Sequence, residues 1–168
     1  SDLSETNLIR ICMEDFKPKY TIRDAEKFQT DRAKMGNFIL EGMDTTGGTD
    51  VDWLIEHRGG FIIMENKSFF SDKISIPLGQ MIAFEKLHEK LNSDGKCHFL
   101  FFGYDDIDFK NQDSTIWYFE MEDWKTKSIP FTRSKTRNKY FVSRNDMKPI
   151  TLKEYRGLME KFWREFEL

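Results

Sequence analysis

The architecture of this chain rests on the sequence VDWLIEHRGGFIIMENK, residues 51–67. Val51–His57 and Phe61–Lys67 are rich in apolar residues, which is typical of β-strands. The glycines between the two stretches favour a tight turn near Arg58. We therefore expect an antiparallel hairpin whose register is fixed by that turn.

Three charged residues of this hairpin are predicted to converge. A turn near Arg58 pairs Asp52 with Glu65, and directly opposed residues on antiparallel strands have Cβ atoms about 4.5–5.5 Å apart. Glu65 and Lys67 are two residues apart, so both side chains leave the same face of their strand. Two carboxylates held that close repel each other unless a cation lies between them. The hairpin therefore predicts a divalent cation between Asp52 and Glu65, beside Lys67.

This trio suits the hydrolysis of a phosphodiester bond. Asp52 and Glu65 would hold Mg²⁺ through oxygen ligands, with the backbone carbonyl of Asn66 as another. The metal would activate a water and bind the scissile phosphate, while Lys67 would orient that water or stabilise the developing charge. Oxygen ligands fit such a hard cation better than zinc. In the alternative interpretation, Asp50 and Asp52 only begin a strand, and Glu65 and Lys67 form a solvated ion pair at the end of another.

The helix expected at residues 79–91 carries one polar residue at the head of its apolar stripe. Gln80 shares that stripe with Phe84, Leu87 and Leu91 at helical spacing. We therefore expect Gln80 to point toward the edge of the sheet. There it would position the attacking water or a phosphate, or it would only cap the helix.

The remaining patterns predict one α/β domain over residues 1–168. We expect helices at residues 4–16, 24–34, 79–91 and 151–166, and strands at residues 51–57, 61–67, 96–104, 115–121 and 140–143. The last helix begins with a capping box formed by Thr151 and Glu154. Residues 68–77 are expected to form a loop. This order of elements predicts helices packed around one mixed sheet.

Composition excludes several classes of protein. The 168-residue chain carries 26 Lys and Arg against 29 Asp and Glu, a formal charge of −3, so overall positive charge cannot drive nucleic-acid binding, although a local basic face can. Cys12 and Cys97 are too few for a disulfide framework and are expected to be reduced thiols. The sequence shows neither a membrane-spanning run nor a secretory signal. We expect a cytoplasmic or nucleoid-associated protein that is not secreted and has no membrane partner.

One local basic stretch is a candidate for binding nucleic acid. Arg133, Lys135, Arg137 and Lys139 alternate with uncharged residues. Such a run can grip the phosphate backbone, and we expect DNA rather than RNA as the partner. A solvated loop is an equally good interpretation of the same residues.

The spacing Asp-x(12)-Glu-x-Lys, followed by a helix with Gln, resembles the PD-(D/E)xK nuclease superfamily. Residues 48–52, 65–67 and 77–87 resemble the virus-type replication-repair nucleases and the archaeal Holliday-junction resolvases, and the likeness covers residues 44–104. It implies a restriction-endonuclease-like core with a mixed central β-sheet flanked by α-helices. It also implies Mg²⁺ or Mn²⁺ as cofactor, a role in DNA repair or recombination, and a homodimer, since resolvase-like relatives pair to cut two strands.

The sequence departs from that family pattern in ways that leave choices open. Val51 stands where the family often has Pro, so Asp50 is a rival to Asp52 as the metal ligand. The family often adds an acid from its first helix, for which Glu5 fits better than Glu14. The expected function is a metal-dependent DNA nuclease, with branched or flapped DNA among its candidate substrates. The alternatives are a non-catalytic module that binds nucleic acid or protein, and an RNA endonuclease.

Overall fold

The computed structural model describes residues 23–39, 41 and 48–168. The chain divides into two compact units, Ser1–Gly48 and Thr49–Leu168. In the first unit, helix α2 spans Ala25–Ile39 and extends beyond the predicted helix at residues 24–34. The helix predicted at residues 4–16 lies outside the described residues. The prediction of one domain over the whole chain stays a prediction.

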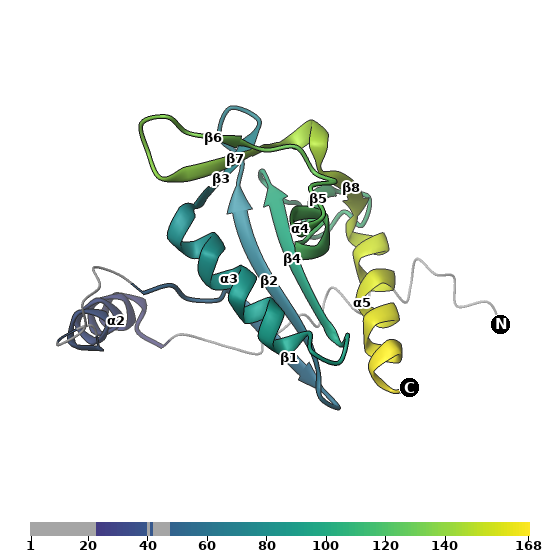
Figure 1. Ribbon diagram of the computed structural model, residues 1–168, viewed down its shortest axis with the longest axis horizontal. Helices are drawn as coiled ribbons and strands as arrows, with labels where there is room; N and C mark the ends of the chain where they lie inside the picture. The colour runs from purple at the N-terminus through teal and green to yellow at the C-terminus, as the bar shows by residue number, and fades with distance from the viewer. Residues whose placement is uncertain (1–22, 40, 42–47) are drawn as a thin grey trace. The chain divides into compact units, whose positions relative to one another are not determined.

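The second unit is a mixed α/β fold in which helices flank a five-stranded sheet (Figure 1). Its strands are β1 Trp53–His57, β2 Gly60–Ser68, β3 Lys73–Pro77, β4 Cys97–Tyr104, β5 Thr115–Glu120, β6 Thr132–Arg133, β7 Lys139–Ser143 and β8 Lys148–Thr151. Its helices are α3 Leu78–Leu91, α4 Met121–Lys125, the 3₁₀ turn η1 Arg144–Asp146 and α5 Leu152–Phe166. No helix in the described ranges has the length and hydropathy needed to span a bilayer.

The predicted hairpin is confirmed, including its register. Trp53 pairs with Met64, and His57 pairs with Gly60. Arg58 and Gly59 form the turn with φ angles of 49° and 81°, a left-handed conformation that glycine adopts without steric cost. β2 then runs parallel to β4, and the connection between them contains β3 and α3.

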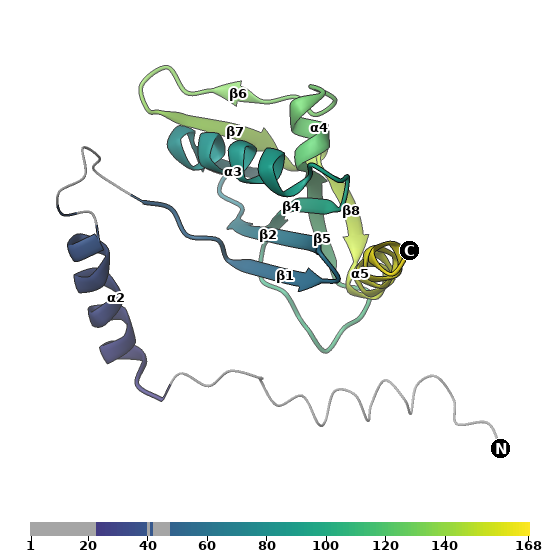
Figure 2. The ribbon, with the colours of Figure 1, turned by 60° about the horizontal axis from the view of Figure 1, so that its bottom comes forward.

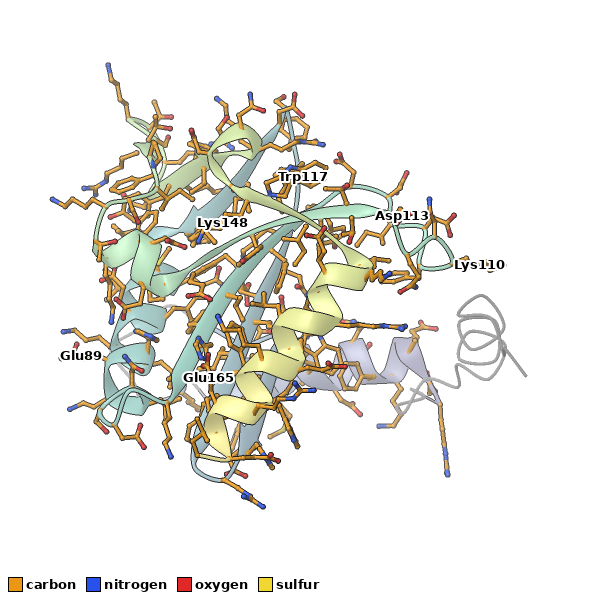
Figure 3. All side chains as sticks on the ribbon, turned by 90° about the vertical axis from the view of Figure 1, so that its right-hand side faces the viewer. Glu89, Lys110, Asp113, Trp117, Lys148 and Glu165 are labelled. Carbon is orange, nitrogen blue, oxygen red and sulfur yellow. The ribbon has the colours of Figure 1, made fainter. Side chains whose placement is uncertain are left out.

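Alternation along β2 divides its side chains between the two faces of the large sheet. Ile63 packs in a core that also contains Met81 and Phe84 of α3. Ile62 and Met64 pack on the opposite face, in a core that contains Phe162 and Phe166 of α5. Figure 3 shows α5 crossing that face, with Glu165 on its side toward β4. The same alternation directs Glu65 and Lys67 toward the α3 face and Asn66 toward the α5 face.

The prediction that residues 68–77 form a loop is wrong, and so is the prediction of a single sheet. β3 pairs with β7, and β7 pairs with β6, in a separate three-stranded sheet, of which Figure 2 shows β6 and β7. Ile74 and Ile76 of β3 are fully buried in the α3-side core. The alternation of Ile74 and Ile76 with polar residues is too short to distinguish a strand from a loop. The partner strand that makes this segment a strand lies more than 60 residues further along the chain.

Four further short elements, α4, β6, η1 and β8, were not predicted, while one predicted cap is confirmed. β8 and α4 occupy four and five residues, which is too short for a periodic pattern to be recognised. At the start of α5, the Thr151 hydroxyl accepts a hydrogen bond from the backbone N–H of Glu154 at 3.1 Å, and the Glu154 carboxylate accepts one from the N–H of Thr151.

Arg144 joins the small sheet to the large one. Its guanidinium lies 4.2 Å from the ring centre of Phe69 and 4.7 Å from that of Trp117, which Figure 3 labels near β5. The same group forms ion pairs with Asp72 at 2.8 Å and with Asp105 at 2.7 Å. The planar cation therefore binds two rings and two carboxylates from separate parts of the chain.

Candidate active site

The candidate site lies where the end of β2 meets the first turn of α3. Lys67 Nζ is 3.1 Å from Glu65 Oε1 and donates a hydrogen bond to Gln80 Oε1 at 2.7 Å. Gln80 Nε2 donates in turn to Glu65 Oε1 at 3.2 Å. The three side chains form a closed ring of contacts, which holds each of them in one orientation.

Asp52 lies at the open end of the hairpin, one residue before β1 begins. The ladder therefore stops short of the predicted Asp52–Glu65 pair. The Asp52 carboxylate instead accepts a hydrogen bond from the backbone N–H of Asn66 at 2.7 Å. This bond fixes Asp52 beside the residue that separates Glu65 from Lys67.

Glu65 is the buried carboxyl of the cluster, and burial disfavours its charged form. It is only 4% exposed, and its Oε2 atom has no hydrogen-bond partner among the described residues. Burial raises the pKa of the Glu65 carboxyl, Lys67 lowers it, and the negative charge of Asp52 raises it. Burying a carboxylate oxygen without a partner costs free energy. One carboxylate oxygen of Glu65 is therefore buried without a hydrogen-bond partner among the described residues.

Sequence reasoning missed one member of the cluster. Gln80 Nε2 also donates a hydrogen bond to the hydroxyl of Thr49 at 3.2 Å. Thr49 lies in a non-repetitive segment before β1, where no periodic pattern indicates the direction of a side chain. Its proximity to Gln80 depends on how α3 packs across the sheet, which the sequence does not reveal.

Three other acidic residues were candidate metal ligands: Asp50, Glu5 and Glu14. Asp50 is exposed and two residues further from β1 than Asp52, while Glu5 and Glu14 lie outside the described residues. Within residues 23–39, 41 and 48–168, no group of three or more His, Cys, Asp or Glu side chains is placed to hold a metal ion. A cation here would depend on Asp52, Glu65 and the carbonyl of Asn66.

The basic stretch lies beside the candidate site. Arg133 ends β6, Lys135 and Arg137 occupy the exposed loop, and Lys139 begins β7 opposite Pro77 of β3. The backbone carbonyl of Asn138 accepts a hydrogen bond from the N–H of Leu78, the first residue of α3, at 2.8 Å. The β6–β7 hairpin is therefore attached to the helical turn that carries Gln80 (Figure 1).

The cluster has the groups that acyl- or phosphoryl-transfer chemistry uses. Lys67 supplies a cation, Glu65 and Asp52 supply acceptor oxygens, and Gln80 supplies an amide that can both donate and accept. No protein-family model and no curated protein sequence matches this chain. The assignment of function therefore depends on the geometry of these residues.

Proposed function

We propose that this chain is a metal-dependent nuclease that hydrolyses phosphodiester bonds in DNA, built on a restriction-endonuclease-like core. The observation that carries the proposal is the cluster of Asp52, Glu65, Lys67 and Gln80 at one end of the hairpin. Structural ion pairs are usually exposed, whereas Glu65 is buried with an oxygen that lacks a partner among the described residues. A bound divalent cation would supply that partner.

The donor set fits Mg²⁺ or Mn²⁺. Both cations prefer oxygen ligands, which Asp52, Glu65 and the carbonyl of Asn66 would provide. When bound, the metal would activate a water and neutralise charge on the phosphate. Lys67 would stabilise the charge that develops on the phosphate oxygens, since its ammonium is fixed by two contacts. Gln80 would hold Lys67 in place and orient the water.

A cleavage assay tests the proposal directly. Labelled linear, circular, branched and flapped DNA would be incubated with the chain, with and without Mg²⁺ or Mn²⁺, and resolved on a gel. We expect cleavage of at least one DNA that stops when EDTA is added. Absence of cleavage from every substrate with both metals would contradict the proposal, and cleavage of a matched RNA alone would identify an RNA endonuclease.

Metal binding gives a readout that does not depend on activity. We expect Mn²⁺ to raise the thermal unfolding temperature of the wild-type chain, because a ligand that binds only the folded state stabilises it. Glu65→Gln keeps the size of the side chain but removes its charge, so the Mn²⁺-dependent rise should disappear. Differential scanning fluorimetry over a Mn²⁺ titration measures both proteins.

The same titration separates the nuclease from a non-catalytic binding module. Glu154→Gln is a suitable control, because Glu154 is an exposed carboxylate at the start of α5, on the other face of the large sheet. It should respond to Mn²⁺ as the wild type does. Equal responses from wild type and Glu65→Gln would place any bound metal elsewhere and would favour the non-catalytic module.

The β6–β7 hairpin is proposed to hold the DNA backbone. Replacing Arg133, Lys135 and Arg137 by Ala should weaken DNA binding and make it depend less on salt. Each lost phosphate contact makes the negative slope of log association constant against log salt concentration shallower by about 0.9. Fluorescence anisotropy at several salt concentrations measures this slope. Replacing Arg156, Lys161 and Arg164 of α5 by Ala changes the net charge equally on exposed positions of another element. An equal loss in both triple variants would contradict a specific role for the hairpin.

A further inference from the structure

A second feature lies behind the candidate active site, on the α5 face of the large sheet. A pocket of about 710 Å³ is bounded by β1, β2, β4, the β4–β5 loop and the start of α5. Figure 3 labels Lys110 and Asp113 in that loop. Five aromatic side chains line it: Trp53, Phe102, Tyr104, Phe109 and Tyr155. The volume is in the range of sites that enclose a small organic group.

We propose that this pocket receives a single nucleobase, splayed out of the DNA strand whose phosphate lies at the candidate active site. The inference rests on the proposed nuclease function and defines its substrate further, as a strand with at least one unpaired nucleotide beside the cut. Bases that carry an exocyclic amino group fit the pocket best.

The aromatic rings at the mouth of the pocket are unusually open to solvent. Trp53 is 51% exposed and Phe109 is 66% exposed, although both line the pocket. Large apolar groups left in water are costly, and stacking a base on them would remove that surface. Every base has a π-face, so aromatic stacking accepts any base and does not require a double helix.

The polar groups of the pocket match the edge of a base. The Tyr155 hydroxyl has Met64 Sδ as its partner at 3.4 Å, and a thioether is a weak acceptor. Burial raises the pKa of Tyr155, so its hydroxyl keeps the proton that it can donate to a ring nitrogen or carbonyl. Tyr155 therefore offers a donor to a ligand that presents a stronger acceptor than sulfur.

The two acids at the rim differ in their state of pairing. Asp105 forms an ion pair with Arg144 at 2.7 Å. Asp106 forms neither an ion pair nor a side-chain hydrogen bond with any residue that the structure describes. A carboxylate at this place accepts hydrogen bonds from the amino group of cytosine, adenine or guanine. Its negative charge also disfavours entry of a phosphate, which leaves the base as the part of a nucleotide that enters.

Residues that line the pocket are direct neighbours in the sequence of residues in the candidate active site. Trp53 follows Asp52, and Asn66, which lines the pocket, lies between Glu65 and Lys67. Consecutive Cα atoms are only about 3.8 Å apart. β1 is an edge strand that begins at Trp53, so the pocket and the candidate active site lie on opposite faces of the sheet beside the same edge. A phosphate at Asp52 and a base against Trp53 thus belong to neighbouring positions of one strand.

An abasic scan tests the pocket. Single-stranded DNA and duplexes with an unpaired end would carry one abasic position each, and binding would be measured by fluorescence anisotropy in EDTA, which prevents cleavage. We expect one position to weaken binding by about tenfold, in line with the usual contribution of base stacking. In the Trp53→Ala and Phe109→Ala variants, an abasic site at that position should weaken binding no more than an abasic site elsewhere. Phe109 is an exposed loop residue, so its replacement does not endanger the fold.

Trp163→Ala is the matched control. Trp163 is 43% exposed on α5, where it stacks on His57 and does not line the pocket. This variant should keep the position-specific abasic effect. If wild type cleaves DNA and no abasic position weakens binding more than the others, the pocket proposal is wrong and the nuclease proposal stands. If wild type binds DNA without cleaving it and no abasic position differs, both proposals are wrong. If the abasic effect is present in a chain that cleaves no DNA, the pocket stands and the nuclease proposal is wrong.

Discussion

Lys67→Ala should reduce DNA cleavage by about 10²–10³-fold, the usual effect of removing one fixed donor from a charged transition state. Lys67 Nζ contacts both Glu65 Oε1 and Gln80 Oε1, so the variant removes the cation and also releases two neighbouring side chains. The rate constant should fall more than the affinity for DNA, because the ammonium acts on charge that develops only during the reaction. Single-turnover cleavage measured over a range of enzyme concentrations up to saturation separates the rate constant from the affinity.

A second lysine gives the matched control for this experiment. Lys86 lies on α3, its side chain is 73% exposed, and it pairs with Glu89, which Figure 3 labels on the surface. Surface ion pairs of this kind contribute little to stability, so Lys86→Ala should cleave DNA at the wild-type rate. Circular dichroism would show whether each variant remains folded. A folded Lys67→Ala chain that cleaves as fast as Lys86→Ala would exclude Lys67 from the reaction.

Phe101→Ala should lower the free energy of unfolding by about 3–5 kcal/mol, the usual cost of deleting a buried Phe side chain. Phe101 has no exposed surface, and its ring stacks with those of Phe99 and Phe119 at centroid distances of 5.1 and 4.8 Å. It is also the β4 partner of Glu65 in the parallel ladder. The cavity would therefore open beside the buried carboxylate as well as in the core.

Urea denaturation measures this loss of stability, with Phe70→Ala as the control. Phe70 is 85% exposed and precedes the turn into β3, so its removal should change the free energy of unfolding by less than about 0.5 kcal/mol. Similar midpoints for the two variants would mean that the ring of Phe101 is not packed as described.

The hairpin and the direction of its side chains could be predicted because they depend on local patterns. Alternation in β2 and the glycines of the turn determine that Glu65 and Lys67 share a face. Helical spacing likewise places Gln80 at the head of the inward stripe of α3, where it reaches Glu65 and Lys67. Residues close in sequence were enough for these three placements.

The parts that could not be predicted depend on distant pairing. β3 becomes a strand only because β7 lies beside it, and Thr49 reaches Gln80 only because α3 crosses the sheet at that place. The pocket requires Met64 and Tyr155 to meet, although 91 residues separate them in the chain. Single-sequence patterns carry no information on contacts of that range, and short elements such as β8 carry too little signal of their own.

The ring of Glu65, Lys67 and Gln80 also has a consequence for the order of folding. Its hydrogen bonds join residues 13 and 15 positions apart, whereas the bond from Tyr155 to Met64 closes a loop of 91 positions. Short loops lose less chain entropy on closure. The charged cluster should thus assemble before the aromatic cavity during refolding. Pulse-labelling hydrogen exchange would disprove this order if the amides of α5 became protected first.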